Sequence, residues 1–79
     1  MSQQLLANQN MPTLRINVQG QAVTILQLLF NNFHGLQIKV DGIFGQETEN
    51  AVKDFQGSRN LHLTGIVDFA TWEALVNED

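Results

Sequence analysis

Apolar residues recur at helical spacing in three segments of this chain. They predict helices from Gln21 to His34, from about Gln46 to Arg59 and from Phe69 to about Val76. The side chains expected to face inward are Val23, Ile25, Leu26, Leu28, Leu29, Phe30 and Phe33 in the first helix, Phe44, Thr48, Ala51, Val52 and Phe55 in and just before the second, and Phe69, Trp72, Leu75 and Val76 in the third. The predicted fold class is all-α, a compact three-helix bundle with short extended connectors.

Residues that start and stop helices stand at the edges of these segments. Gly45 and Asp68 are acceptable N-cap residues, and each directly precedes a predicted helix. Gly35 follows the first helix and Asn60 the second, and these residue types most readily adopt the left-handed backbone of a helix C-terminus. Local chemistry therefore predicts the same helix ends as the periodicity does.

An internal repeat links the second and third helices. Residues 42–52 match residues 65–75, with Gly-Ile, an N-cap residue, Thr and Ala at equal spacing. A second match joins the first two helices: residues 22–27 read Ala-Val-x-x-Leu-Gln and residues 51–56 read Ala-Val-x-x-Phe-Gln. Gln27 and Gln56 are the last residues of these two segments. Because their amides are uncharged, we expect both side chains to point inward and bond the backbone of the connectors.

Residues 1–12 differ in composition from the rest. They are rich in Gln and Asn, and three apolar residues at positions 5–7 are too few for a signal-peptide core or a membrane span. We expect a disordered N-terminal arm over residues 1–12 and one domain over residues 13–79. Within the domain, a short pairing is expected between Ile38 to Val40 and Leu63 to Ile66.

Composition narrows the possible functions. Four Lys and Arg against eight Asp and Glu give a net charge of −4, which argues against binding to nucleic-acid phosphates. The absence of cysteine excludes thiolate nucleophiles and sulfur-ligated zinc. His34 and His62, even with a carboxylate such as Asp41 or Asp68, match no recognised metal-ligand spacing. We expect a monomeric binding module with no cofactor and no metal, rather than an enzyme.

A dozen positions agree in order and spacing with a known family. They are Leu14-Arg15, Gly20, Val23, Leu26-Gln27, Gly35, the stretch Asp41 to Gln56, Leu61, Thr64 to Val67, Thr71-Trp72 and Leu75. Over roughly residues 13–76 the chain resembles the peptidoglycan-binding domain type 1 family. The resemblance implies a non-catalytic three-helix module that accompanies bacterial wall hydrolases, amidases, peptidases or transpeptidases. It also implies a periplasmic or cell-wall location, although this chain shows no signal peptide.

The chain departs from the family pattern at four positions. The family often has Gly or Asp where Asn17 and Thr64 stand, and Gly where Asn60 and Asp68 stand. Each of these replacements can preserve a turn or a cap by different chemistry. The fold is therefore expected to be retained.

The expected ligand is the glycan or the stem peptide of peptidoglycan, bound in a shallow groove. The groove is predicted from the turn before the second helix, the start of that helix and the connector before the third, with the candidate residues Asp41, Phe44, Gly45, Gln46, Glu47, Thr64, Phe69 and Trp72. Asp41 has the alternative role of bonding its own turn, and Phe44 and Trp72 that of core residues. An alternative function is a scaffold or pro-domain that packs on a partner domain.

Overall fold

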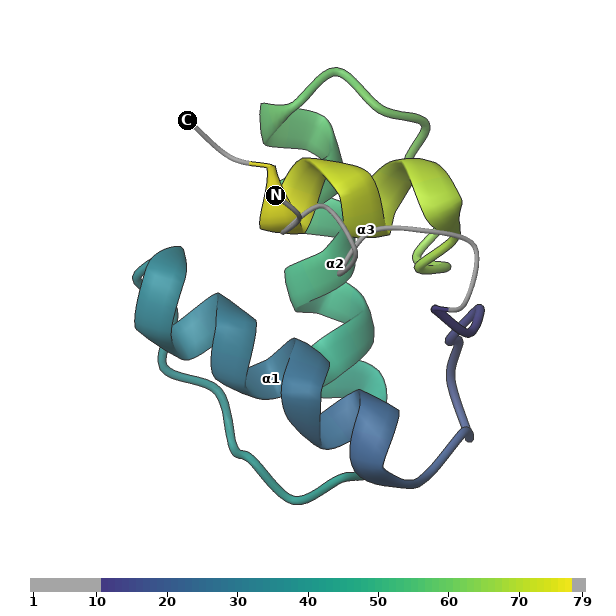
Figure 1. Ribbon diagram of the computed structural model, residues 1–79, viewed down its shortest axis with the longest axis vertical. Coiled ribbons are helices and arrows are strands. Elements are labelled where there is room, and N and C mark those ends of the chain that lie inside the picture. Colours follow the sequence, from purple (N-terminus) through teal and green to yellow (C-terminus); the bar gives the residue numbers. More distant parts are fainter. Residues whose placement is uncertain (1–10, 78–79) are drawn as a thin grey trace, which may run out of the picture.

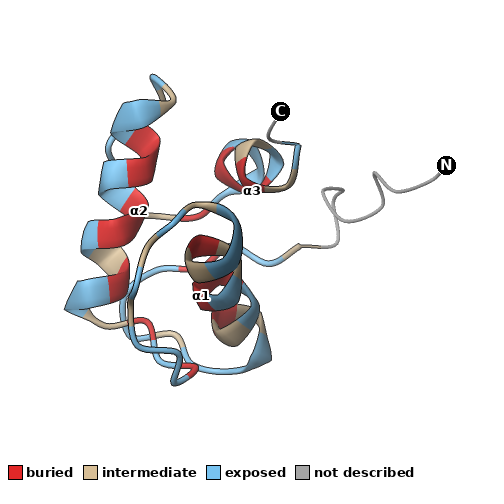
Figure 2. Cartoon of the chain, turned by 90° about the vertical axis from the view of Figure 1, so that its left-hand side faces the viewer, coloured by how far each residue is buried: buried red, intermediate tan, exposed pale blue. Residues whose placement is uncertain are grey.

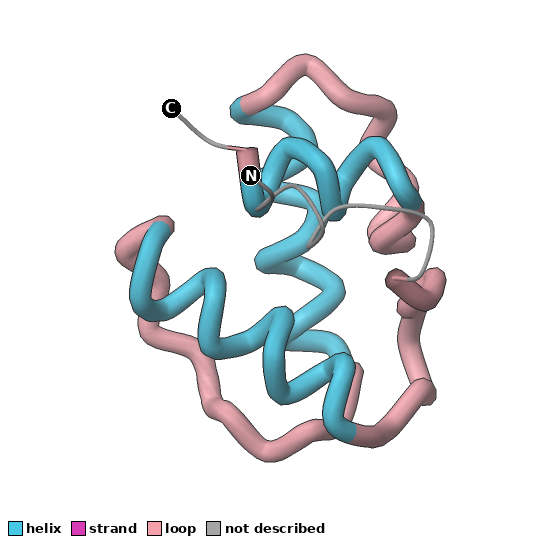
Figure 3. The backbone as a smooth tube through the Cα atoms, in the orientation of Figure 1, coloured by secondary structure: helices cyan, strands magenta, loops and turns pink. Residues whose placement is uncertain are grey.

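Three helices make up the regular structure of the described chain. The computed structural model describes residues 11–77 and contains α1 (Gln21–Phe33), α2 (Gln46–Ser58) and α3 (Phe69–Val76). Figure 1 and Figure 2 show α1 and α3 on the same side of α2, which crosses both. The rest of the described backbone is loop and turn (Figure 3). The predicted all-α fold and its three helices are confirmed, with α1 and α2 each ending one residue earlier than predicted.

The two predicted N-caps lie where they were expected. Gly45 is the N-cap of α2, and its carbonyl accepts a hydrogen bond from the N–H of Glu49 at 2.9 Å. Asp68 is the N-cap of α3, and its Oδ1 accepts a hydrogen bond from the N–H of Thr71 at 3.1 Å. Asp68 thereby satisfies a backbone donor that would otherwise have no partner in the first turn of a short helix.

The C-terminus of α2 is closed by a left-handed asparagine. Asn60 has φ 62°, and the N–H of Leu61 donates to the carbonyl of Gln56 at 2.8 Å while that of Asn60 donates to Gly57 at 3.3 Å. This pair of bonds is the Schellman motif. Asn60 and Asn17, which has φ 82°, both take the left-handed conformation, at positions where the family often has Gly (Asn60) and Gly or Asp (Asn17). Both departures therefore preserve the backbone by a different residue type.

The core lies between α2 and the other two helices. One face of α2 is buried along its length (Figure 2), and Phe55 on that face packs edge to face against Phe30 of α1 with ring centroids 5.9 Å apart. The buried hydrophobic side chains are Leu14, Val23, Leu26, Phe30, Phe44, Ala51, Val52, Phe55, Val67, Trp72 and Leu75. Burial of this cluster is the main favourable contribution to the stability of the fold.

The first helix is less buried than its apolar composition predicted. Ile25, Leu28 and Phe33 are 45%, 42% and 71% exposed, and Phe69 at the start of α3 is 52% exposed. The prediction that these four side chains face inward was wrong. Only one face of α1 packs on the rest of the domain, and the residues that fill it are Val23, Leu26, Gln27 and Phe30.

The connectors do not pair with each other as predicted. Two isolated antiparallel bridges instead join the segment before α1 to the two connectors, one between Leu14 and Val67 and one between Gln19 and Ile43. The N–H and carbonyl of Ile38 are already occupied, because the amide of Asn31 bonds both at 2.9 and 2.8 Å. The segment from residue 14 to residue 20 therefore supplies the backbone partners that the connectors need.

Met11 and Pro12 lie just before the predicted domain boundary at residue 13. Met11 packs against the core, and the carbonyl of Pro12 accepts a hydrogen bond from the indole Nε1–H of Trp72 at 2.6 Å. These two residues therefore contact the domain, although the sequence placed them in the N-terminal arm. The arm prediction for residues 1–10 and the domain end at residues 78–79 lie outside the described residues.

Candidate functional site

The turn before α2 is held by the side chain of Gln27. Its Oε1 accepts hydrogen bonds from the N–H groups of Asp41 and Gly42 at 3.0 and 2.9 Å. Its Nε2 donates to the carbonyl of Ile43 and to the Thr48 hydroxyl at 3.1 and 3.0 Å. The amide is 1% exposed, so these bonds satisfy a buried polar group completely. The prediction that Gln27 bonds connector backbone is confirmed.

Gln56 holds the turn before α3 in the same way. Its Oε1 accepts from the N–H of Gly65 at 3.0 Å, and its Nε2 donates to the carbonyl of Ile66 and to the hydroxyls of Thr71 and Thr64 at 3.0, 3.1 and 3.3 Å. Gln56 is also 1% exposed. The internal repeat in the sequence therefore corresponds to two glutamine-bound turns, each leading into a helix.

Asp41 bonds its own turn, as its alternative role predicted. Its Oδ1 accepts from the N–H of Ile43 at 3.0 Å and from Gln27 Nε2 at 3.2 Å. These bonds, the one from Ile43 first, lower the pKa of the Asp41 carboxyl below its ordinary value of 3.8. In the second turn Thr64 takes the equivalent position, and its Oγ1 accepts from the N–H of Ile66 at 3.0 Å.

Two of the predicted groove residues lie in the core. The side chains of Phe44 and Trp72 are both 0% exposed, so neither offers a surface on which a ligand could stack. Phe44 precedes α2 and packs inside the bundle, and Trp72 is buried on α3 with its indole N–H bonded to Pro12. For these two residues the core alternative holds, and their placement in the groove is corrected.

Asp41 and Glu47 both contact Lys39. The ammonium of Lys39 lies 3.9 Å from Asp41 Oδ2, and its backbone N–H donates to Glu47 Oε1 at 3.2 Å. The side chain of Lys39 is 75% exposed, so this ion pair lies on the surface and contributes little to stability. The structure therefore brings these two predicted residues together at the surface beside the first turn of α2.

The start of α2 lies beside the connector before α3. Gln46 Nε2 donates to Glu49 Oε1 at 2.9 Å, and a Cβ placed on Gly65 would lie only 3.0 Å from Glu49 Cγ. Glu49 therefore bonds Gln46 and also lies beside the turn that contains Thr64 and Gly65. Thr64 is exposed, and so is Phe69.

A pocket opens between the end of α2 and the start of α3. This α2–α3 pocket has a volume of about 330 Å³ and is lined by Gln56, Asn60, Leu61, His62, Thr64, Asp68, Ala70 and Thr71. Four of the eight lining residues carry an uncharged amide or hydroxyl, namely Gln56, Asn60, Thr64 and Thr71. Among the predicted groove residues it contains Thr64, and exposed Phe69 lies next in sequence to two of its lining residues.

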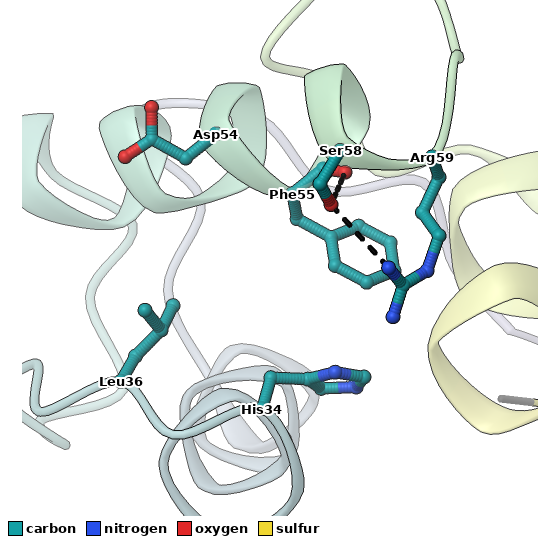
Figure 4. Close-up of a pocket in the computed structure, with 6 residues that line it drawn as sticks. All are labelled: His34, Leu36, Asp54, Phe55, Ser58 and Arg59. Atoms are coloured by element: carbon teal, nitrogen blue, oxygen red, sulfur yellow. Dashed lines mark hydrogen bonds between the residues drawn. The ribbon is translucent and has the colours of Figure 1, made fainter. Parts of the chain in front are cut away.

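A second pocket lies between the end of α1 and the second half of α2. This α1–α2 pocket has a volume of about 260 Å³ and is lined by His34, Leu36, Asp54, Phe55, Ser58 and Arg59 (Figure 4). The guanidinium of Arg59 lies over the Phe55 ring, 4.9 Å from its centroid, in a cation–π contact. None of the predicted groove residues lines this pocket.

The two histidines line different pockets, His34 the α1–α2 pocket and His62 the α2–α3 pocket. Within residues 11–77 no three His, Asp or Glu side chains gather in a way that could hold a metal ion. None of the described helices is both long enough and apolar enough to cross a membrane.

Sequence reasoning missed most of the pocket residues. Asn60, Leu61 and His62 follow α2 directly, at a helix stop that the sequence signalled, and they lead into the predicted Thr64 connector. That continuity was the signal that could have placed them beside Thr64. The α1–α2 pocket had no such signal, because it joins residues about 20 positions apart, such as His34 and Asp54.

Comparison with known proteins gives a consistent picture. A family model described as "Putative peptidoglycan binding domain" matches residues 19–75. The chain is 30% identical over 67 residues to the uncharacterized protein FadG of Bacillus subtilis (strain 168), a match that covers 82% of the chain and 12% of FadG.

Two solved structures share both the fold and part of the sequence. The endolysin of the Burkholderia AP3 phage is 34% identical with a TM-score of 0.77, over 81% of this chain and 24% of the endolysin. A fused Zn-dependent amidase/peptidase/peptidoglycan-binding domain-containing protein of Clostridium acetobutylicum ATCC 824 is 33% identical with a TM-score of 0.77, over 84% of this chain and 29% of that protein. The chain thus spans less than a third of each of these relatives. It belongs to the peptidoglycan-binding domain family.

Proposed function

We propose that this chain is a non-catalytic, monomeric module that binds peptidoglycan and holds a wall-active enzyme against the cell wall. The observation that carries the proposal is the family match over residues 19–75. The endolysin and the fused amidase contain the similar domain as 24% and 29% of their chains, which supports a module joined to or associated with a catalytic domain. Its place of action in this proposal is the bacterial cell wall or the periplasm.

The proposed contact surface is the α2–α3 pocket with the exposed groups beside it. Thr64, His62 and Asn60 offer hydroxyl, imidazole and amide groups for hydrogen bonds to a wall glycan or stem peptide. Phe69, 52% exposed, offers a ring face on which the apolar face of a sugar can stack. Gln46 lies on the same side through its bond to Glu49, which packs beside the Thr64–Gly65 turn.

The surface in this proposal extends to the turn before α2. Gly45 ends that turn, and Asp41 and Glu47 flank it around Lys39. The first turn of α2 holds Glu47 and Glu49, so broad attraction to anionic wall polymers is unfavourable here. Hydrogen bonding and stacking are therefore the expected sources of affinity.

Retention on purified, insoluble peptidoglycan tests the function and the surface together. Phe69→Ala should lower retention several-fold, and Phe33→Ala, which removes an exposed ring on α1, is the matched control. Gln46→Ala and Glu47→Ala should weaken retention while changing stability by no more than about 0.5 kcal/mol, because exposed positions tolerate truncation. Melting temperatures measured in parallel separate lost binding from lost folding.

Two results of the retention assay would contradict different parts of the proposal. Absence of retention of the wild-type chain would contradict the function, and equal retention of all these variants would contradict the surface. Amide chemical-shift mapping with muropeptides, and separately with glycan oligomers that lack peptide, then identifies which part of the wall is bound.

A second candidate function is supported by the exposed apolar side chains of α1. Ile25 and Leu28 are 45% and 42% exposed on one helix and could pack on a partner protein domain. Under this alternative, replacing both residues by Gln abolishes binding to the partner domain and leaves wall retention unchanged. Failure of the wild-type chain to bind peptidoglycan, together with tight binding to a purified catalytic domain, would favour it.

A further inference from the structure

We propose that the α1–α2 pocket binds the carboxyl-terminal end of a short peptide, with the free carboxylate held at its His34 and Arg59 end. This site is separate from the surface proposed for wall binding, because the two pockets share no lining residue. The buried Nε2 atom of His34, the position of Arg59 and the distribution of charge along the pocket support this proposal.

The imidazole of His34 carries an unsatisfied polar atom. His34 is the C-cap of α1, and its ring packs edge to face on Phe55 with the centroids 5.1 Å apart. Its Nε2 is buried without a hydrogen-bond partner, the one such side-chain atom found among the described residues. Leaving a buried nitrogen unpaired costs about 1–3 kcal/mol. Rotation of the imidazole toward the pocket that it lines would bring Nε2 within reach of a carboxylate oxygen, and a hydrogen bond from Nε2–H to that oxygen would remove this cost.

Arg59 places a permanent positive charge at the same end of the pocket. Its guanidinium stacks on the Phe55 ring that also contacts His34, and Nη1 lies 3.5 Å from Ser58 Oγ. Figure 4 shows the guanidinium and the imidazole directed toward each other from α2 and α1. A guanidinium has five N–H donors in a planar fork and matches a carboxylate in geometry.

The opposite end of the pocket carries the opposite charge. Asp54 lies at the end away from Arg59 (Figure 4), and Leu36 and Phe55 supply the apolar lining. Asp54 and Arg59, the C-cap of α2, are five positions apart, which corresponds to about 7.5 Å along a helix axis. A ligand with a carboxylate at one end, an ammonium at the other and small apolar side chains between them is complementary to this arrangement.

The size of the pocket limits the ligand to one or two residues. Its volume of about 260 Å³ lies just below the range of about 300–1,000 Å³ typical of drug-sized ligands. The chemistry is shared by a stem peptide of the wall and by any free peptide with a carboxyl terminus. The experiment must therefore separate these sources.

Titration of the whole chain with the dipeptide dialanine, followed by amide chemical shifts, tests the site without the wall. Dialanine should shift the amides of residues 34–36 and 54–59 in a saturable way. Dialanine amide, which lacks the carboxylate, should bind at least ten-fold more weakly. N-acetyl-dialanine, which lacks the ammonium, should bind only a few-fold more weakly, because the exposed Asp54 is screened by solvent.

Matched variants test the two residues that hold the carboxylate. Arg59→Gln and His34→Phe should each weaken dialanine binding at least five-fold, whereas Arg15→Gln and His62→Phe, which change residues outside the pocket, should not. Competition of dialanine with insoluble peptidoglycan separates the sources: release from the wall identifies a wall peptide as the ligand, and retention with full dialanine binding identifies a free peptide.

Comparison of dialanine with its amide uses only the wild-type chain, so it is decisive even where a variant fails to fold. Equal affinity for the two dipeptides, or no localised shifts at tens of millimolar, overturns the proposal. Either result leaves the wall-binding function untouched, because retention on peptidoglycan is measured independently.

Discussion

Gln27 and Gln56 have the same structural role at two different turns. Gln27 extends from α1 to bond the turn at residues 41–43 and Thr48 at the start of α2. Gln56 extends from α2 to bond the turn at residues 64–66 and Thr71 at the start of α3. Each buried amide therefore joins one helix to the entry of the next, and the two links act in series along the chain.

Truncation of either glutamine should be severe. Gln56→Ala removes four hydrogen bonds and leaves the N–H of Gly65 and the hydroxyl of Thr71 in the core without this partner. We expect a loss of about 3 kcal/mol, because buried unpaired groups each cost about 1–3 kcal/mol. This is comparable to the whole stability of about 3–5 kcal/mol expected for a core of this size.

Urea unfolding measures this loss, and Gln46→Ala, at an exposed position, is the matched control. A Gln56→Ala variant that unfolds at the same urea concentration as Gln46→Ala would show that the amide is not a structural link.

Gly65 is required both for its backbone conformation and for lack of a side chain. Its φ is 75°, and an added Cβ would lie 3.0 Å from Glu49 Cγ and 3.1 Å from Lys53 Cε. Gly65→Ala should therefore cost about 1–2 kcal/mol for the left-handed backbone alone. Gly45→Ser is the control, because Ser is also a favoured N-cap residue and Gly45 has φ −105° and open space around it. Equal melting temperatures for the two variants would contradict the argument.

Phe55 joins the core to the α1–α2 pocket. Its ring is 6% exposed and packs on Phe30 with a centroid distance of 5.9 Å. Phe55→Ala should destabilise the domain by about 3–5 kcal/mol, as truncation of a buried aromatic ring does. Phe33→Ala, at a position 71% exposed, should have little effect. Thermal unfolding of both variants checks the prediction, which fails if Phe55→Ala melts close to the wild-type temperature.

Asp41 should make the stability of the fold depend on pH in the acidic range. Hydrogen bonds from Ile43 and Gln27 lower its pKa in the folded state below the ordinary value of 3.8. A lowered folded pKa means that the contribution is fully present above the unfolded pKa and is lost as pH falls through the folded pKa. The wild-type melting temperature should therefore fall as pH decreases below 3.8.

The Asp41→Asn variant has no carboxylate to titrate at this position. Its melting temperature should therefore fall less than that of the wild type over the same pH range. Thermal scans at successive pH values check this difference. Parallel curves for the two proteins would show that Asp41 does not contribute to the pH dependence.

Much of the candidate site could not be predicted from the sequence. Thr64 and Phe69 were identified and are exposed, but the same predicted groove also included Phe44 and Trp72, which are buried. Periodicity shows that an aromatic residue lies on an apolar helix face. It does not show whether another element covers that face, and the entry segment covers Trp72 through the Pro12 carbonyl.

The sequence by itself determined the helices and their ends, because these depend on local interactions. A cap such as Asp68 bonds a donor three residues away, and a left-handed residue such as Asn60 ends a helix through its own backbone. The repeat likewise indicated the two glutamine-bound turns, since Gln27 and Gln56 stand in equivalent positions.

Only the tertiary structure decided which backbone groups pair and which surfaces remain open. Nothing in the sequence prevented Ile38 from pairing with the other connector. In the structure Asn31 bonds the backbone groups of Ile38, and Leu14 pairs with Val67. The α1–α2 pocket likewise brings His34 from one helix end to Arg59 at another. Such contacts depend on how the helices cross, and crossing is determined by side-chain packing between elements, which the local pattern of a single chain does not encode.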